Sequence, residues 1–310
     1  MIMQLISKDL LGLKELSKEE ISLILDTADT MRLVLSANSK KTSHLQGKSV
    51  VTLFYENSTR TRLSFEMASK FMGASSANIS ASGSSVKKGE SLIDTARTID
   101  SMATDIVIMR HQQSGAPHLI ASKINASVIN AGDGMNEHPT QALLDMMTIR
   151  KHKGTLEGLK VAIVGDLLHS RVARSNLWGL SKMGAQVYLA GPATMVPPGI
   201  ERTPAILCSK VEDAVKDADV VMGLRVQLER QQSGLFPSVS EYARFFSISE
   251  DVLKMAKSDA ILMHPGPCNH GVEMPTAVYD SPQSVINEQV SNGVAVRMAV
   301  LYLLTSRRNQ

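Results

Sequence analysis

Residues 50–73 have the sequence VVTLFYENSTRTRLSFEMASKFMG, and this stretch decides the fold class. Its first part, residues 50–55, is short, β-branched and aromatic, as is typical of a buried strand. Its last part has apolar side chains at roughly helical spacing between positions 63 and 72, and Gly73 can end the helix. The sequence therefore predicts a strand, a turn and a helix in direct succession.

The turn itself, residues 58–62, is Ser-Thr-Arg-Thr-Arg. The first N–H groups of a helix have no acceptor within the helix, and the helix dipole is positive there, so this end favours an anion. Ser58 can act as the N-cap, while Arg60 and Arg62 offer planar donor pairs suited to phosphate. The alternative is a capped helix with solvated arginines. Five such residues directly after a strand favour the anion site.

Strand and helix patterns alternate along the rest of the chain. Further strands are expected at residues 75–79, 106–109, 128–130, 160–166, 186–190, 220–224 and 260–263, and helices at 17–31, 92–102, 138–151 and 293–304 and after residues 117 and 171. This alternation predicts an α/β fold with parallel sheets and helices on both faces.

The length of 310 residues favours two such domains, although a one-domain barrel is an alternative. We expect the first domain at residues 1–137 and the second at residues 138–290. The last segment, residues 291–310, is expected to be a helix that packs back on the first domain.

The composition is that of an ordinary soluble protein, with 43% hydrophobic residues, 20% charged residues and a net charge of +3. So small a net charge does not favour nucleic-acid binding. The two cysteines, Cys208 and Cys268, have no metal-ligand spacing, and neither a signal peptide nor a membrane-spanning run is recognised. We therefore expect a cytoplasmic protein that binds neither nucleic acid nor a membrane.

Chemically useful residues follow many of the expected strands. They are Arg110, His138 with Gln141, Arg171, Arg225 with Gln227, and the loop from His264 to Pro267. Ligands of parallel sheets bind at the carboxyl ends of strands, which favours a shared function. For single residues the structural alternatives remain: Arg110 pairs with a carboxylate, His138 is a structural hydrogen-bonding residue, and Lys87 and Lys88 are solvated.

The glycine at position 165 does not make a dinucleotide site, because no second or third glycine follows at the required spacing. The sequence also has no recognisable pair of nucleophile and base and no metal-ligand cluster. We therefore expect no cofactor and no metal. The residues instead favour group transfer by positioning and electrostatics.

Several segments together resemble a known family: FYENSTRTR at 54–62, SSVKKGE at 84–90, HPTQ at 138–141, GDLLHSR at 165–171, RVQ at 225–227 and HPGP at 264–267. In this order they resemble the aspartate/ornithine carbamoyltransferase family over essentially the whole chain. Members that use ornithine have a His-Cys-Leu-Pro loop and a Ser-Met-Gly element for a cationic substrate. Here Gly266 and the cationic Arg225 indicate a dicarboxylate, so the chain is more similar to the aspartate branch.

The resemblance implies transfer of the carbamoyl group of carbamoyl phosphate to the amine of L-aspartate. The products are N-carbamoyl-L-aspartate and phosphate, in pyrimidine biosynthesis. The first domain would bind carbamoyl phosphate and the second aspartate. The alternatives are a carbamoyltransferase for ornithine or another amine, which Arg225 and Gly266 disfavour, and a non-catalytic homologue, which the presence of Arg60, Arg110 and His138 disfavours.

The resemblance also implies roles for individual residues. Carbamoyl phosphate would be bound by Ser58, Thr59, Arg60, Thr61, Arg110, His138, Gln141, Gly266 and Pro267. Aspartate would be bound by Lys88, Arg171, Arg225 and Gln227. The implied catalytic residues are Arg60, Thr61, Lys88, Arg110 and His138, of which Thr61, Arg110 and His138 would polarise the carbamoyl oxygen. The leaving phosphate would accept the amine proton.

Finally, the resemblance implies a homotrimer whose active sites lie between subunits. Ser84 and Lys88 would come from the neighbouring subunit, and Glu56 would tie arginines of the second domain to the first. A regulatory chain or a dihydroorotase as a further partner is left open.

Overall fold

The computed structural model describes residues 4–80, 89–227 and 238–308. The chain divides into two compact units. The first comprises Met1–Met147 and Val290–Gln310, and the second comprises Thr148–Gln289. The division expected at residue 137 differs from this one, because helix α5 (Pro139–Lys153) begins in the first unit and continues without a break into the second.

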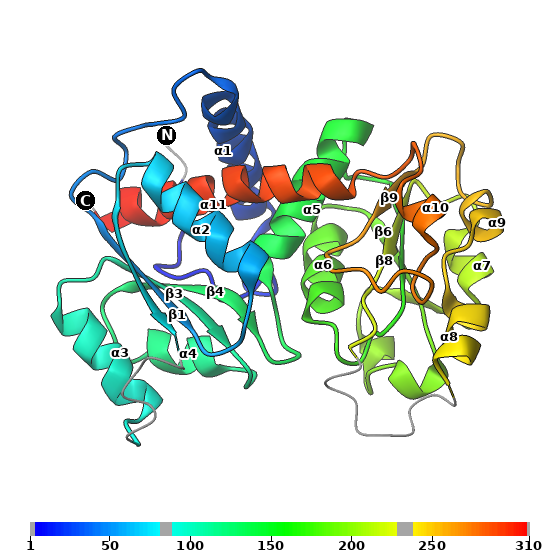
Figure 1. Cartoon of the computed structure of the whole chain (residues 1–310), viewed down its shortest axis with the longest axis horizontal. Coiled ribbons are helices and arrows are strands. Elements are labelled where there is room, and N and C mark those ends of the chain that lie inside the picture. The colour runs from blue at the N-terminus through cyan, green and yellow to red at the C-terminus, as the bar shows by residue number, and fades with distance from the viewer. Residues whose placement is uncertain (1–3, 81–88, 228–237, 309–310) are drawn as a thin grey trace. The chain divides into compact units, whose positions relative to one another are not determined.

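The first unit is built on a parallel sheet (Figure 1). Its strands are β1 (Ser49–Phe54), β2 (Ser75–Ser80), β3 (Ile106–His111) and β4 (Ser127–Asp133), in the order β2-β1-β3-β4. Leu10 adds a single parallel bridge to Ile129 of β4. The strands were expected at these places, and β3 and β4 extend further than their patterns indicated.

Helices cover the first sheet. They are α1 (Lys18–Ser36), α2 (Thr59–Phe71), α3 (Leu92–Ser101), α4 (Ala116–Ala121), the start of α5 and the long C-terminal helix α11 (Ile286–Arg308). Leu53, Val107 and Val128 of the sheet pack with α3 and α4. Helix α2 contacts β1 and β2. The C-terminal helix belongs to the first unit from Val290 onward, which confirms that it packs back on this unit.

The second unit repeats the architecture with a different strand order. Its strands are β5 (Lys160–Val164), β6 (Gln186–Ala190), β7 (Ile206–Cys208), β8 (Val220–Gly223) and β9 (Ile261–Met263), all parallel and in the order β7-β6-β5-β8-β9. Its helices are α6 (Arg171–Lys182), α7 (Val211–Val215), α8 (Val239–Phe246), α9 (Glu250–Leu253) and α10 (Thr276–Tyr279), with short 3₁₀ turns at Ala193–Met195 and Ile200–Arg202.

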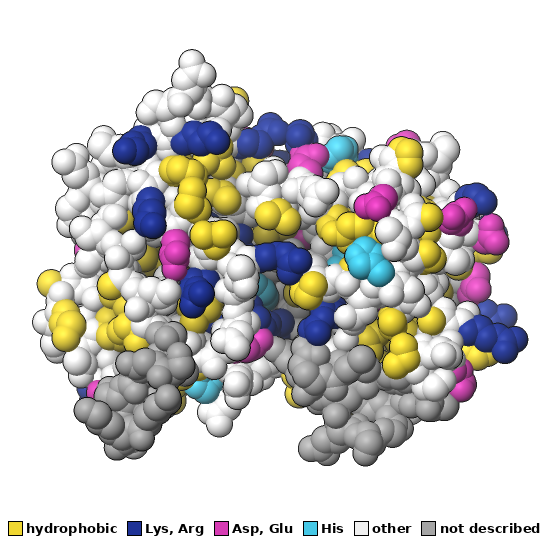
Figure 2. All heavy atoms as spheres, viewed as in Figure 1, with side chains coloured by type: hydrophobic (Ala, Val, Ile, Leu, Met, Phe, Trp, Pro, Cys, Tyr) yellow, Lys and Arg dark blue, Asp and Glu magenta, His cyan; other side chains and the backbone are white. Residues whose placement is uncertain are grey.

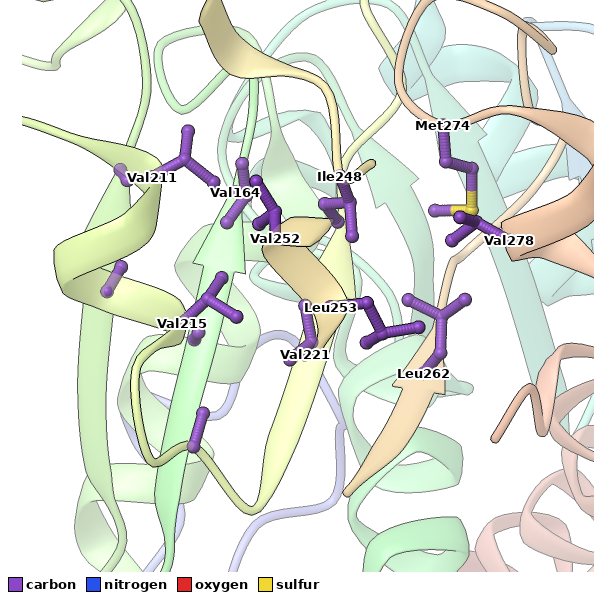
Figure 3. Packing of buried hydrophobic residues seen from close by; sticks show 14 of the residues in the cluster. Val164, Val211, Val215, Val221, Ile248, Val252, Leu253, Leu262, Met274 and Val278 are labelled. Atoms are coloured by element: carbon purple, nitrogen blue, oxygen red, sulfur yellow. The ribbon is translucent and has the colours of Figure 1, made fainter. Parts of the chain in front are cut away.

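An apolar cluster joins the second sheet to its helices (Figure 3). Val221 and Leu262 from neighbouring strands belong to one buried cluster with Val215 of α7 and Leu253 of α9. Strand β7 was not expected, because three residues at an edge, with Ile206 exposed, carry too little periodicity to be recognised. Among the described residues, no helix combines the length and the apolar character needed to cross a bilayer.

The packing of this cluster predicts how much stability the protein would lose if a cavity were made in it. Leu262→Ala removes a fully buried side chain of the cluster, and we expect the free energy of unfolding to fall by about 2–5 kcal/mol. The matched control, Leu33→Ala, changes a side chain that is 69% exposed on α1 and should cost less than about 0.5 kcal/mol. Urea denaturation of both variants measures the difference, and equal losses would contradict the packing described.

Candidate active site

The N-terminus of α2 has the geometry expected of an anion site. Ser58 is the N-cap, with extended backbone (φ −159°, ψ 108°), and its Oγ accepts a hydrogen bond from the N–H of Thr61 at 3.3 Å. Thr59 and Arg60 are exposed at the first positions of the helix, where N–H groups have no acceptor within the helix. Lys and Arg side chains lie on the surface of this unit around α2 (Figure 2). The local field therefore favours an anion here.

Thr61 lies beside His138, which comes from a distant part of the chain. The Oγ1 of Thr61 and the Nε2 of His138 are 3.5 Å apart, and both residues are buried. His138 directly precedes α5, and the backbone N–H of Gln141 donates to its carbonyl at 3.0 Å. The start of α5 is therefore next to the start of α2, so two of the predicted site residues are in contact.

Arg110 stands at the carboxyl end of β3, as predicted. Its Nη2 donates to Oε1 of Glu56 at 2.8 Å, and its Nη1 donates to the carbonyl of Ala131 at 3.3 Å. The ion pair is largely buried, with side-chain exposures of 11% and 18%. These contacts hold the guanidinium plane between the end of β1 and the end of β4. The structure thus realises the pairing of Arg110 with a carboxylate, and Glu56 makes this pair within the first unit.

Two buried carboxylates hold the loop that leads from β4 to His138. Asp133 accepts hydrogen bonds from the N–H of Gly115 at 2.6 Å and from the N–H of Glu137 at 3.1 Å. Glu137 in turn accepts from the N–H of Leu13 at 2.7 Å. Both acidic side chains are at most 5% exposed. Buried carboxylates need such donors, and here the donors are loop N–H groups, so His138 is presented from a well-anchored loop.

Gln141 lies one helical turn after His138 and bonds to a residue that the sequence analysis missed. Its Nε2 donates to Oδ1 of Asp145 at 3.0 Å, and Asp145 is fully buried. Gln and Asp four residues apart share a helix face, which is the signal that could have found the pair.

Arg297 of α11 also lies near these residues and was not recognised from the sequence. Burial lowers the pKa of Arg297 to about 9, and the nearby Arg110 acts in the same direction. The attraction of Asp145 opposes both effects. Arg297 therefore brings a buried positive charge close to Arg110 and Asp145.

In the second unit, Arg171 begins α6 after the N-cap Ser170 and is 5% exposed. The preceding loop is closed by Asp166, whose Oδ1 accepts from the N–H of His169 at 3.1 Å and lies 3.0 Å from its Nδ1. The Nε2 of Gln227 donates to the carbonyl of His169 at 3.2 Å. The loops that follow β5 and β8 are thus joined, and they place Arg171 and Gln227 at the same edge of the sheet.

Glu273 connects the segment after β8 to the loop after β9, and the sequence analysis missed it. Its Oε1 accepts from the N–H of Val226 at 2.7 Å and from Nδ2 of Asn269 at 2.7 Å. The same Nδ2 donates to the carbonyl of Val226 at 3.2 Å. Val226 lies between Arg225 and Gln227, so this buried carboxylate positions two predicted site residues. Its role depends on contacts between segments far apart in the sequence.

The loop after β9 contains Gly266 and Pro267. Gly266 has a φ of +64°, which favours glycine, and its N–H donates to Nδ1 of His264 at 2.9 Å. Pro267 is exposed. The loop therefore turns back on the end of its own strand and offers carbonyl groups at the edge of the sheet.

His264, Cys268 and Glu273 have ligand atoms within 4.8 Å of one another, which raises the question of a metal site. Each of the three side chains also takes part in hydrogen bonds. Because Nδ1 of His264 accepts the N–H of Gly266, the neutral ring carries its proton on Nε2. Burial, together with the charge of Glu273, raises the pKa of Cys268 to about 12, so the sulfur is a thiol that donates to Glu273. In this structure the three side chains are thus joined to the loop after β9 by hydrogen bonds.

The predicted residues thus fall into two groups, one in each unit. The first unit holds Ser58, Thr59, Arg60, Thr61, Arg110, His138 and Gln141 at the carboxyl ends of its strands. The second holds Arg171, Arg225, Gln227, Gly266 and Pro267 in the corresponding places. Ser84 and Lys88 lie outside the described residues.

Comparison with known proteins decides the family. The carbamoyl-phosphate-binding domain of aspartate/ornithine carbamoyltransferases matches residues 8–151, and the Asp/Orn-binding domain of the same family matches residues 157–304. The chain belongs to the aspartate/ornithine carbamoyltransferase family. The residues that carried the resemblance lie in both matched regions.

Relatives within the family are close. The chain is 68% identical to the aspartate carbamoyltransferase catalytic subunit of Ruminiclostridium cellulolyticum, over 98% of this chain and 97% of the relative. It is 64% identical to that of Acetivibrio thermocellus, over 97% and 96%.

Solved structures of carbamoyltransferases share the fold. Aspartate transcarbamoylase from Trypanosoma cruzi, in complex with carbamoyl phosphate and aspartate, superposes with a TM-score of 0.86 at 31% identity and 95% coverage of both chains. The ornithine carbamoyltransferase from Pyrococcus furiosus superposes with a TM-score of 0.87 at 32% identity, over 97% of this chain and 98% of that one.

The raised pKa of Cys268 gives a test of its surroundings. In a Cys208→Ser variant only Cys268 can be alkylated. A raised pKa keeps the thiol protonated at neutral pH, so iodoacetamide should react at about pH 8 more than about 10-fold more slowly than with free cysteine. The rate should still rise at about pH 10. The alkylation rate is measured by quenching the reaction at successive times and determining the modified fraction by mass spectrometry. The urea-unfolded variant is the control. A plateau near the pKa of an ordinary thiol would contradict this description.

Proposed function

We propose that this chain is a carbamoyltransferase that transfers the carbamoyl group of carbamoyl phosphate to the amine of L-aspartate. The products are N-carbamoyl-L-aspartate and phosphate, a step of pyrimidine biosynthesis. The observation that carries the proposal is the match, over nearly the whole chain, to relatives named aspartate carbamoyltransferase at 57–68% identity. The geometry of the two units supports it.

In the proposal the first unit binds carbamoyl phosphate. The phosphate lies at the N-terminus of α2, held by Ser58, Thr59 and Arg60 and by the N–H groups of the first turn. The carbamoyl oxygen lies near Thr61, Arg110 and His138. The contact between Thr61 and His138 at 3.5 Å and the fixed plane of Arg110 support a common target for these donors. Gln141 faces the carbamoyl nitrogen.

The reaction then needs little from the protein beyond position and charge. The unprotonated amine of aspartate attacks the carbamoyl carbon, and the C–N bond forms. Negative charge develops on the carbamoyl oxygen, where Thr61, Arg110 and His138 stabilise it. The bond from carbon to the phosphate oxygen breaks, and the amine proton passes to the leaving phosphate. Preorganised donors at a developing oxyanion are worth a factor of about 10²–10³ each.

The second unit is proposed to select the acceptor. Arg171 and Arg225, with Gln227, offer cationic and polar donors to the two carboxylates of aspartate, and Gly266 and Pro267 offer carbonyl groups to the carbamoyl nitrogen. Ornithine carries a cationic side chain, which these arginines would repel. Likeness of fold does not separate the two acceptors, because the TM-scores to an aspartate and an ornithine enzyme are 0.86 and 0.87.

The proposal extends to the assembly and the location of the protein. We propose a cytoplasmic homotrimer in which Ser84 and Lys88 act in the site of the neighbouring subunit. Relatives carry the name catalytic subunit, which is compatible with a regulatory chain as a further partner, and a dihydroorotase partner is equally open.

The direct test compares acceptors. Purified protein with carbamoyl phosphate should carbamoylate aspartate and leave ornithine unchanged, as measured by product formation. Arg60→Ala should lower kcat/KM for carbamoyl phosphate by about 100-fold or more, because it removes a phosphate donor at the helix N-terminus. Arg202→Ala, which changes an arginine that is 88% exposed in the second unit, serves as control. Carbamoylation of ornithine alone would refute the proposed acceptor.

Shared sites predict complementation. When Arg60→Ala chains and Lys88→Ala chains are mixed, each trimer that contains both kinds of chain keeps one intact site. Random mixing in equal amounts should therefore restore about one quarter of wild-type turnover. Each variant refolded with itself is the control. No recovery, in trimers shown by mass spectrometry to be mixed, would rule out the shared site.

A further inference from the structure

The pair formed by Gln141 and Asp145 lies inside the first unit, on one face of α5. Nε2 of Gln141 and Oδ1 of Asp145 are 3.0 Å apart, and the two side chains are one helical turn apart. Gln141 is 9% exposed, whereas Asp145 is completely buried. Asp145 therefore lies beneath Gln141 and does not reach a ligand on the surface of this unit.

The chemistry of the partner decides which way the amide of Gln141 points. An ionised carboxylate can only accept hydrogen bonds, so Gln141 must turn its NH₂ group toward Asp145. The carbonyl oxygen of the same amide then points away from Asp145. A buried amide with this orientation presents an acceptor, and a donor in the ligand must meet it.

A buried cation supports the charge of Asp145. Arg297 of α11 is 3% exposed, its Nη1 donates to the carbonyl of Gly293 at 2.9 Å, and its guanidinium lies 5.0 Å from the ring centre of Phe65 in α2. Asp145 and Arg297 attract each other electrostatically. An opposite charge nearby favours the ionised form of a buried carboxyl group. Three helices, α2, α5 and α11, thus contribute to the surroundings of the pair.

We propose that Asp145 is a positioning residue that fixes the amide of Gln141 with its carbonyl oxygen toward the substrate, and that it thereby selects acyl phosphates bearing an N–H donor. This inference rests on the proposed function, in which Gln141 faces the carbamoyl nitrogen. The NH₂ of a carbamoyl group satisfies the carbonyl oxygen. The methyl group of an acetyl phosphate leaves it without a partner, which a buried acceptor tolerates poorly.

Two unreactive phosphonates test the proposal by binding alone. Phosphonoacetamide keeps the carbamoyl NH₂, and 2-oxopropylphosphonate has a methyl group in its place. Calorimetry should show that the wild-type protein prefers the amide. Asp145→Asn offers both a donor and an acceptor to Gln141, so the amide can turn over. The preference should fall by about 3- to 10-fold through loss of affinity for phosphonoacetamide, while affinity for the methyl analogue stays within about twofold.

The matched control is Asp105→Asn, which removes a charge at the amino ends of the central strands β1 and β3, where Asp105 accepts from the N–H of Ser49 at 2.9 Å. It should alter neither affinity. Equal losses for both phosphonates in Asp145→Asn would mean that Asp145 only supports the fold, and an unchanged preference would mean that it does not orient Gln141. Either result overturns the proposal.

A second variant keeps the test decisive if Asp145→Asn alone does not fold, because it restores the lost negative charge one helical turn away. Gln141→Glu combined with Asp145→Asn moves the charge by one turn and retains a donor at 145 and an acceptor at 141. It should keep the preference for phosphonoacetamide within about threefold of wild type, although both affinities fall because a carboxylate is nearer the phosphonate. Loss of the preference would overturn the proposal. Because turnover with aspartate is measured separately on the wild-type protein, failure of the proposed function is distinguishable from failure of this inference.

Discussion

The parallel register of β1 against β3 is the constraint on which the first unit's site depends. Phe54, the last residue of β1, pairs with Arg110, and the ladder continues with the N–H of Tyr55 donating to the carbonyl of Arg110 at 2.9 Å. The guanidinium therefore begins level with the turn into α2. A slip by one residue would turn Arg110 to the other face of the sheet, because side chains alternate along a strand. The second unit depends on the same rule, since Arg171, Arg225 and Gly266 all follow parallel strands.

Buried carboxylates carry the next level of organisation in both units. Asp133 and Glu137 bind loop N–H groups before His138, and Glu273 does so beside Arg225. Removing such a group from water is costly unless donors replace the water, so each carboxylate strongly favours one loop conformation. Thr59 and Arg60, which are proposed to face the phosphate, are exposed instead. Buried carboxylates thus hold the loops, while residues at the start of α2 stay open to solvent.

Local pattern was enough to predict most of the secondary structure. The strand, turn and helix around Ser58 and the start of the first helix at residue 17 were predicted close to their observed places, because both depend on neighbours within a few residues. Edge strand β7 and the short helices α7, α8, α9 and α10 were not predicted, since their periodicity is too brief. The division between the units also differs from expectation, because helix α5 carries no break in its sequence that would mark it.

The sequence by itself determined that Ser58 caps a helix rich in donors, that arginines follow several strands, and to which family the chain belongs. These properties reside in residue types and short spacings. Only the tertiary structure decided which of these groups meet. Thr61 meets His138 across 77 residues, and Glu56 pairs with Arg110 in the same unit. Such contacts depend on how helices pack on the sheet, and on burial, which makes an ordinary hydrogen bond decisive for the orientation of a side chain.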